Sequence, residues 1–231
     1  NFGHSDKRGY FLSVPYYINL APNYDDTVTP RYMSRRGLQL QNEFRYMGRN
    51  YGGKLDLEYL PSDRVTETYR AAGKYRHDQT LSAHWNGNMD MQWVSDENYL
   101  VDLGDSIAAT STTHLPRTGQ LAYNDNIWRF TARTSSYQTV DESILPLFRP
   151  YSLLPQFTLA ADLPTGMNRL HYALNSEWVN FDRNAGVIGQ RLDINPSVSL
   201  PWRNSYAFVT PKAGYRYTAY KLTAHDLEPP P

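Results

Sequence analysis

The sequence contains no cysteine among its 231 residues, which excludes a disulfide framework and any zinc site with cysteine ligands. It has no run of about 18 apolar residues, so no membrane-spanning helix is expected, although the strands of a membrane barrel need only alternating residues. Its 23 basic residues are matched by 23 acidic ones, and no basic cluster is longer than a pair such as Arg35 and Arg36, so nucleic acid is not an expected partner. An initiator methionine and a signal segment are also absent, and we expect both ends to be cuts through a longer chain.

Motifs for catalysis are scarce as well. The six histidines are scattered and form no HExxH pair. His77 beside Asp78 is interpreted as a polar pair at a turn. His171 with Asn175 is a thin basis for a barrel lipase, which needs a serine, a histidine and an acidic or amide partner. We therefore predict no enzyme activity and no catalytic residue.

Sites for phosphate, metal or another cofactor are not expected either. Residues 48–54, GRNYGGK, are rich in glycine but indicate a hairpin turn and not a phosphate cradle. Asp25 and Asp26 could hold a hard cation through their carboxylates, yet a solvated turn is the favoured interpretation. The sequence thus predicts no cofactor and no metal.

What the sequence has in quantity is alternation of apolar and polar residues with a period of two. In residues 54–61, KLDLEYLP, the apolar Leu55, Leu57 and Tyr59 alternate with charged residues. A segment of this kind forms a strand with one apolar and one charged face. The pattern recurs down the chain and predicts about twelve strands with almost no helix.

The connections between these strands alternate in length over most of the chain. Short turns are predicted at 124–126, 163–168 and 202–205, and longer polar loops at 61–68, 95–113 and 138–150. Aromatic residues make up 14% of the chain, and many stand at strand ends, as in the girdles of membrane barrels. We therefore predict an all-β fold, an antiparallel up-and-down transmembrane β-barrel, with a soluble β-sandwich as the alternative.

Two prolines interrupt the first part of this pattern. Residues 13–33, SVPYYINLAPNYDDTVTPRYM, indicate two strands joined by a turn, with Pro15 and Pro30 near the middle of each strand. Proline has no N–H to give to a neighbouring strand, so it belongs at an edge, a strand start or a bulge. The sequence therefore predicts weakened pairing here.

This stretch also carries a resemblance to a known family. Residues 15–47, PYYINLAPNYDDTVTPRYMSRRGLQLQNEFRYM, and 55–63, LDLEYLPSD, closely resemble the start of the barrel of the LptD family of lipopolysaccharide-assembly proteins. The match extends more thinly through HD at 77–78 and VSDENY at 94–99. From about Ser106 onward only the barrel pattern remains.

The resemblance implies a 26-stranded barrel in the outer membrane of a Gram-negative bacterium. In the family this barrel is plugged by the lipoprotein LptE and preceded by a periplasmic jelly-roll domain that receives lipopolysaccharide from the bridge protein LptA. Residues 1–231 would supply the first half of the barrel, without the jelly roll and the remaining strands. The expected partners are lipopolysaccharide, outer-membrane lipids, LptE, LptA through the missing domain, and the barrel-assembly machinery during folding.

The resemblance also implies the function and its gate. Lipopolysaccharide is inserted into the outer leaflet through a lateral seam between the first and last strands. The gate residues that it implies are Pro15, Pro30, Tyr16 and Tyr32. Each proline removes a hydrogen bond worth about 0.5–1.5 kcal/mol at the seam, which weakens its closure. Protection of a strand edge from aggregation is the alternative role for the prolines. A general porin and a soluble glycan-binding sandwich are the alternative functions.

The lumen is predicted from strand parity, on the rule that the apolar parity meets lipid. Sugars and phosphates need hydrogen-bond partners of both signs, so the polar parity of the first strands would form the substrate path. The residues predicted to line it are Asn19, Arg31, Gln39, Gln41, Glu43, Arg45, Asp56 and Glu58.

Overall fold

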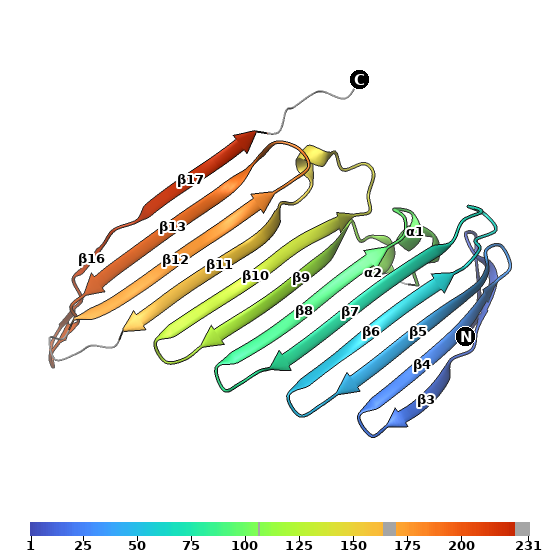
Figure 1. Cartoon of the computed structure of the whole chain (residues 1–231), viewed down its shortest axis with the longest axis horizontal. Coiled ribbons are helices and arrows are strands. Elements are labelled where there is room, and N and C mark those ends of the chain that lie inside the picture. Colours follow the sequence, from blue (N-terminus) through green and yellow to red (C-terminus); the bar gives the residue numbers. More distant parts are fainter. Residues whose placement is uncertain (106, 164–169, 225–231) are drawn as a thin grey trace. The chain divides into compact units, whose positions relative to one another are not determined.

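The computed structural model describes residues 1–105, 107–163 and 170–224 (Figure 1). These residues form seventeen strands, two short α-helices and one 3₁₀ turn. The strands are β1 (Phe2–Ser5), β2 (Gly9–Ser13), β3 (Tyr16–Ala21), β4 (Tyr24–Met33), β5 (Gly37–Met47), β6 (Tyr51–Leu60), β7 (Arg70–Thr80), β8 (Trp85–Val94), β9 (His114–Asn124), β10 (Trp128–Thr139), β11 (Ser152–Leu163), β12 (His171–Asp182), β13 (Val187–Ser199), β14 (Trp202–Arg203), β15 (Phe208–Val209), β16 (Lys212–Gly214) and β17 (Tyr217–Ala224). The helices are α1 (Tyr99–Leu103) and α2 (Ile107–Thr110), and the 3₁₀ turn is η1 (Pro146–Phe148).

The prediction of an all-β chain is confirmed. Twelve of the strands are six residues or longer, which is the number that the period-two pattern predicts. The other five are too short to produce a pattern of their own. Within the described residues, no helix has the length and apolar character needed to cross a membrane.

The described chain folds as two compact units. Unit 1 comprises Asn1–Thr80, Asn88–Thr118 and Tyr137–Leu145. Unit 2 comprises Leu81–Gly87, Gly119–Ser136 and the described residues from Pro146 onward.

Unit 1 is an antiparallel meander in which β4, β5, β6 and β7 pair in chain order (Figure 1). The β4–β5 ladder runs without a break from Met33 opposite Gly37 to Tyr24 opposite Tyr46. The β6–β7 ladder is equally regular, from Leu60 opposite Arg70 to Tyr51 opposite Gln79. Residues that face each other across such ladders lie on the same face of the sheet, so the register decides which side chains share a surface.

The two prolines mark the point at which β4 changes its partner. β3 pairs with β4 as far as Tyr16 opposite Val28, and β2 pairs with β4 from Ser13 opposite Arg31. Pro30 lies inside β4, as predicted, but Pro15 does not lie in mid-strand, because it occupies the gap between β2 and β3. The only backbone bond across this gap runs from the Val14 N–H to the Pro30 carbonyl, at 3.1 Å, among the described residues. The missing N–H groups therefore fall where the partner of β4 changes from β3 to β2.

A small apolar core lies at one end of the unit 1 strands. Its buried members are Met33, Leu60, Val94, Tyr99, Leu103, Leu115 and Val140. Tyr99 and Leu103 come from α1, within the segment 95–113 that the sequence predicts to be a polar loop. Helices of five and four residues are too short to show a 3.6-residue period, which is why the pattern missed them.

Unit 2 is also antiparallel, and β10, β11, β12 and β13 pair in it in chain order. One edge of β13 is shared, because β17 pairs along its first half and β16 along its second half. Residues 209–218 alternate apolar and polar side chains, which predicts one continuous strand, but they are divided among β15, β16 and β17, with Pro211 between the first two. The hairpin of β14 and β15 contains the predicted turn at 202–205. The predicted turn at 163–168 lies almost wholly outside the described residues.

Candidate functional site

The eight residues predicted to line a lumen share one face of unit 1. Across β4 and β5, Arg31 lies opposite Gln39. Across β5 and β6, Gln41 lies opposite Glu58 and Glu43 opposite Asp56. The same face continues to β3, where Asn19 pairs with Asp25 and Asp25 with Arg45. We call this surface, formed by the polar parity of β3 to β7, the polar face.

One part of the polar face is open and carries a ladder of exposed ion pairs. The guanidinium of Arg45 donates two hydrogen bonds to the carboxylate of Asp25, at 2.8 and 2.9 Å. Next to it, the ammonium of Lys54 lies 2.8 Å from Glu43 and 3.0 Å from Asp56. These side chains are all partly exposed and alternate in charge, so the surface offers donors and acceptors of both signs to a hydrated ligand.

The other part of the polar face is covered by α1. The Tyr99 hydroxyl donates to Glu58 Oε2 at 2.7 Å, and the Gln39 amide donates to the same oxygen at 3.0 Å. Burial, and then the neighbouring Glu58 carboxylate, raise the pKa of Tyr99 well above its usual range, so the phenol remains a donor. Arg31 and Gln39 are at most 1% exposed. The predicted lumen residues are therefore divided between an open and a covered region.

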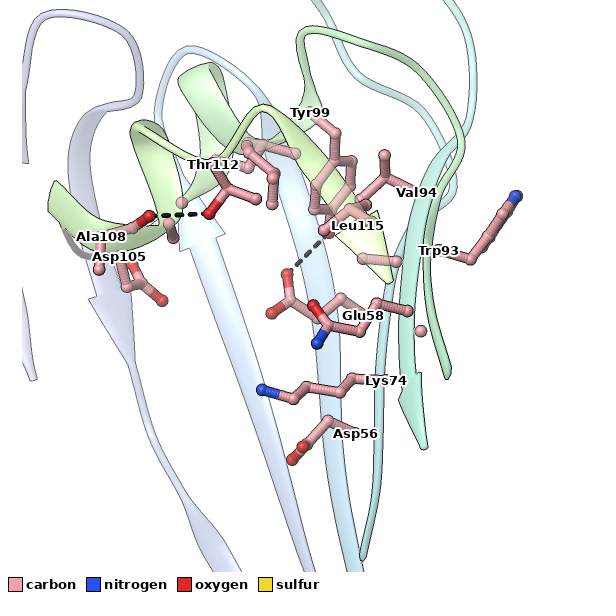
Figure 2. Close-up of a pocket in the computed structure, with 17 residues that line it drawn as sticks. Asp56, Glu58, Lys74, Trp93, Val94, Tyr99, Asp105, Ala108, Thr112 and Leu115 are labelled. Atoms are coloured by element: carbon pink, nitrogen blue, oxygen red, sulfur yellow. Dashed lines mark hydrogen bonds between the residues drawn. The ribbon is translucent and has the colours of Figure 1, made fainter. Parts of the chain in front are cut away.

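A cavity of about 510 Å³ lies between the strands and the segment that contains α1 and α2. Figure 2 shows Asp56, Lys74 and Glu58 on its strand side, with the hydrogen bond that the Tyr99 hydroxyl donates to Glu58. The helical segment adds Leu103, Asp105 and Ala108 among others. The wall is thus partly charged and partly apolar.

An ion cluster holds this segment to the strand ends. Asp63, which is fully buried, accepts hydrogen bonds from Arg36 at 2.7 Å and from Arg70 at 3.2 Å. Arg70 also reaches Asp96 at 2.6 Å and Asp102 at 2.9 Å. Arg36 approaches the same Asp102 oxygen at 3.2 Å. Two arginines therefore bind three carboxylates, two of which belong to the segment 95–113.

Two carboxylates of this cluster, those of Asp63 and Asp96, are held in the ionised state. Burial acts to raise the pKa of Asp63, but hydrogen bonds from the Val65 N–H, Arg36 and Arg70 outweigh it and leave the pKa below its usual range. The same balance applies to Asp96, where burial is opposed by the hydrogen bonds from Arg70 and Ser95. The cluster is thus charged at neutral pH.

Sequence reasoning missed most of the groups that cover the polar face. Arg8, Arg36 and Asp102 stand in segments with no alternating pattern, and Arg70 begins an alternating segment that gives no sign of its buried partners. Asp63, Asp96 and Tyr99 do belong to the LPSD and VSDENY stretches that carry the family resemblance, and this was the available signal. Their roles depend on contacts between residues 26 to 41 positions apart, which periodicity cannot reveal.

The gate candidates Tyr16 and Tyr32 lie on the opposite, apolar face. Tyr16 is paired with Val28, which has the same parity on β4 as Pro30 and Tyr32. Both tyrosines are largely exposed, as are Leu38 and Leu40 on the same face. In the described chain, the only strand paired with β3 is β4.

Two sequence interpretations of polar pairs are wrong, and His171, which was considered with Asn175, has another partner. Asp25 and Asp26 lie in β4 and not in a turn. Asp25 binds Arg45, and Asp26 binds Asn42. His77 lies in β7 and not at a turn, and its imidazole hydrogen-bonds Tyr46 and Gln79. His171 contacts Asp162 across the β11–β12 hairpin and not Asn175. Within the described ranges, no group of three or more His, Cys, Asp or Glu side chains is placed to hold a metal ion.

Comparison with known proteins matches this architecture to one family. The family model described as LptD, LPS transport system D, matches residues 68–229. The chain is 40% identical to the LPS-assembly protein LptD of Nitrosomonas eutropha over 225 residues, covering 95% of this chain and 31% of that protein. It is 40% identical to the LPS-assembly protein LptD of Nitrosococcus oceani over 222 residues (95% and 30%), and 36% identical to that of Bordetella pertussis over 238 residues (98% and 30%). The chain thus spans about a third of the length of these curated relatives, and it belongs to the LptD family.

Proposed function

We propose that the intact protein containing this chain inserts lipopolysaccharide into the outer leaflet of a Gram-negative outer membrane. The observation that carries this proposal is the separation of two surfaces on β3 to β7, one apolar and exposed, the other polar with charges of both signs. An amphiphile with acyl chains and phosphorylated sugars needs such a pair of surfaces. Relatives that match nearly the whole chain are named LPS-assembly proteins, which supports the same substrate and a non-enzymatic role.

In this proposal residues 1–231 are part of the barrel domain, and their strands are completed by others in the intact protein. The polar face lines the lumen, where Gln41, Glu43 and Arg45 meet the sugars. The apolar face meets the bilayer. A plugging lipoprotein of the LptE type would cover part of the open region, LptA would deliver the substrate through a jelly-roll domain, and the barrel-assembly machinery would insert the strands.

We further propose that the lateral gate opens beside β3. This strand is short, has one paired edge among the described residues, and ends where Pro15 and Pro30 interrupt the ladder. Each absent N–H lowers the cost of parting the strands by about 0.5–1.5 kcal/mol. Tyr16 and Tyr32, on the apolar face beside this gap, would meet the acyl chains as they leave.

Photo-crosslinking in cells tests this proposal. A light-activated residue is placed in the intact protein at Tyr16 or Tyr32, and at Tyr172 of unit 2, which is also exposed, as a control. We expect lipopolysaccharide adducts at the first two positions and few at the third. Adducts at none of the three positions in a folded, membrane-inserted protein would reject the gate, and ion conductance by the purified protein would then favour a general porin.

A further inference from the structure

Two arginines from distant parts of unit 1 converge on one aspartate. Arg8, in the turn between β1 and β2, donates from Nη1 to Asp105 Oδ1 at 2.7 Å. Arg31, in β4, donates from Nη2 to the same oxygen at 2.6 Å and from Nη1 to Oδ2 at 3.2 Å. Asp105 follows α1 by two residues, so a single carboxylate joins three separate segments.

The arginines are held in place by groups other than Asp105. The Phe11 ring packs against both guanidiniums, 4.8 Å from Arg8 and 5.4 Å from Arg31. Arg8 also donates to Ser5, and Arg31 to the side chain of Gln39. The pair would therefore keep its geometry if the aspartate left.

Burial differs sharply between the cations and their partner. The side chains of Arg31 and Arg8 are 2% and 14% exposed, whereas that of Asp105 is 60% exposed. The Arg31 Nε is buried and has no hydrogen-bond partner among the described atoms. The carboxylate of Asp105 thus lies on the solvent side of two largely buried guanidiniums, and one donor of Arg31 remains without a partner in the described part of the chain.

The charges of the three residues do not balance. Two guanidiniums and one carboxylate sum to +1, and the carboxylate of Glu58 is separated from Arg31 by the Gln39 amide. A phosphate monoester carries a charge of about −1.5 to −2 at neutral pH and three acceptor oxygens, and arginine forks bind it in bidentate fashion. It would neutralise the pair better than the single carboxylate does.

We propose that Arg8 and Arg31 form a binding site for a phosphate group of the lipopolysaccharide headgroup, and that Asp105 occupies it as a tethered carboxylate until the phosphate displaces it. The site rests on the proposed function and adds to it a defined contact for the substrate. Arg31 also holds the Leu103 carbonyl, at 3.5 Å. Displacement of Asp105 would loosen only the side of the segment that carries Ala108 and Thr112, part of the cavity wall, because Arg31 still holds the Leu103 carbonyl and the ion cluster still holds Asp102.

Binding measurements with two forms of the lipid test this site. The probes are lipopolysaccharide with its lipid phosphates intact and the same material after enzymatic dephosphorylation, added to the intact protein in detergent. We expect Asp105→Asn, which removes the competing charge but keeps the shape, to bind the phosphorylated form roughly tenfold more tightly than the wild type. Arg8→Gln should bind it several-fold more weakly. Neither change should alter the affinity for the dephosphorylated form.

Matched controls separate this site from general electrostatics. Asp193→Asn and Arg216→Gln break an exposed aspartate–arginine pair of unit 2, with a distance of 2.9 Å, and should leave both affinities at the wild-type value. Circular dichroism and thermal melting establish that Arg8→Gln is folded. Excess inorganic phosphate should not displace the lipid from Asp105→Asn, and displacement would instead indicate a site for free phosphate.

The failure of this inference differs from the failure of the proposed function. If the wild type binds lipopolysaccharide but Asp105→Asn and Arg8→Gln bind both forms as the wild type does, the arginine pair is not a phosphate site and the proposed function stands. If the wild type binds neither form and gives no adducts in cells, the proposed function itself fails.

Discussion

The covered and open regions of the polar face arise from the same strands and the same alternating pattern, yet their charges have different environments. In the open region, Arg45 is 51% exposed beside Asp25. In the covered region, Arg70 is 2% exposed and contacts three carboxylates. The difference shows that strand parity selects the face, whereas a segment packed on top of it decides whether a charge is solvated or buried.

Energetic consequences follow from this contrast. Neutralising one partner of a solvated ion pair lowers the free energy of unfolding little, because water replaces that partner. A buried pair leaves an uncompensated charge in a medium of low polarisability. Substitutions of the same chemical kind should therefore have very different effects in the two regions.

The largest effect is expected at Asp63. Asp63→Asn retains an acceptor for the Val65 N–H but removes the charge that lies between Arg36 and Arg70. We expect the free energy of unfolding to fall by about 3 kcal/mol. Urea titration of the intact protein in lipid vesicles measures this. A change no larger than that of Asp25→Asn would remove the distinction between the two regions.

Tyr99→Phe should have the next largest effect. It deletes the hydroxyl that donates to Glu58 and accepts from Gln39, while the ring can remain in the core. We expect a loss of about 2 kcal/mol, since a hydrogen bond to a charged group is removed. The same titration applies, and Tyr123→Phe is the control, because its hydroxyl also donates to a carboxylate, Asp125, but lies at a turn in unit 2.

The sequence predicts the strands and their polar face, but it does not predict the segment that covers part of this face. Alternation in β4, β5 and β6 identifies the strands and the polar parity, because a period of two is a local property of the chain. The covering segment was predicted to be a polar loop, because Asp96, Asp102 and Asp105 give it a solvated composition. Their partners Arg8, Arg31 and Arg70 come from other strands and turns, and such contacts leave no periodic trace.

Acidification should release the covering segment. The pKa values of Asp63 and Asp96 are lowered in the folded protein, so their contribution to stability is present above the usual carboxyl pKa of about 4 and is lost as the pH falls through the lowered values. Amide hydrogen exchange at Asp102 and Gly104, which both donate within α1, reports this release. We expect their protection to decrease below about pH 4, before that of β5, whereas a simultaneous loss would indicate global unfolding.

The smallest effect is expected at Asp25. Asp25→Asn removes the charge partner of Arg45 in the open region. We expect the unfolding free energy to remain near the wild-type value and the difference to shrink further at high salt, because exposed pairs are screened. A large, salt-independent loss would show that this region is shielded from water in the intact protein.

A distance measurement between the covering segment and the strands tests directly whether buried ion pairs hold this segment on the polar face. Nitroxide side chains at Ala108 and Lys74, which both line the cavity, report whether the segment lies on the polar face. If buried ion pairing holds it there, the wild type gives one short distance at neutral pH, and Asp63→Asn adds a longer, populated distance. An identical, single short distance in both proteins would contradict a role for the ion pairs, because the segment would then be held by its apolar contacts alone.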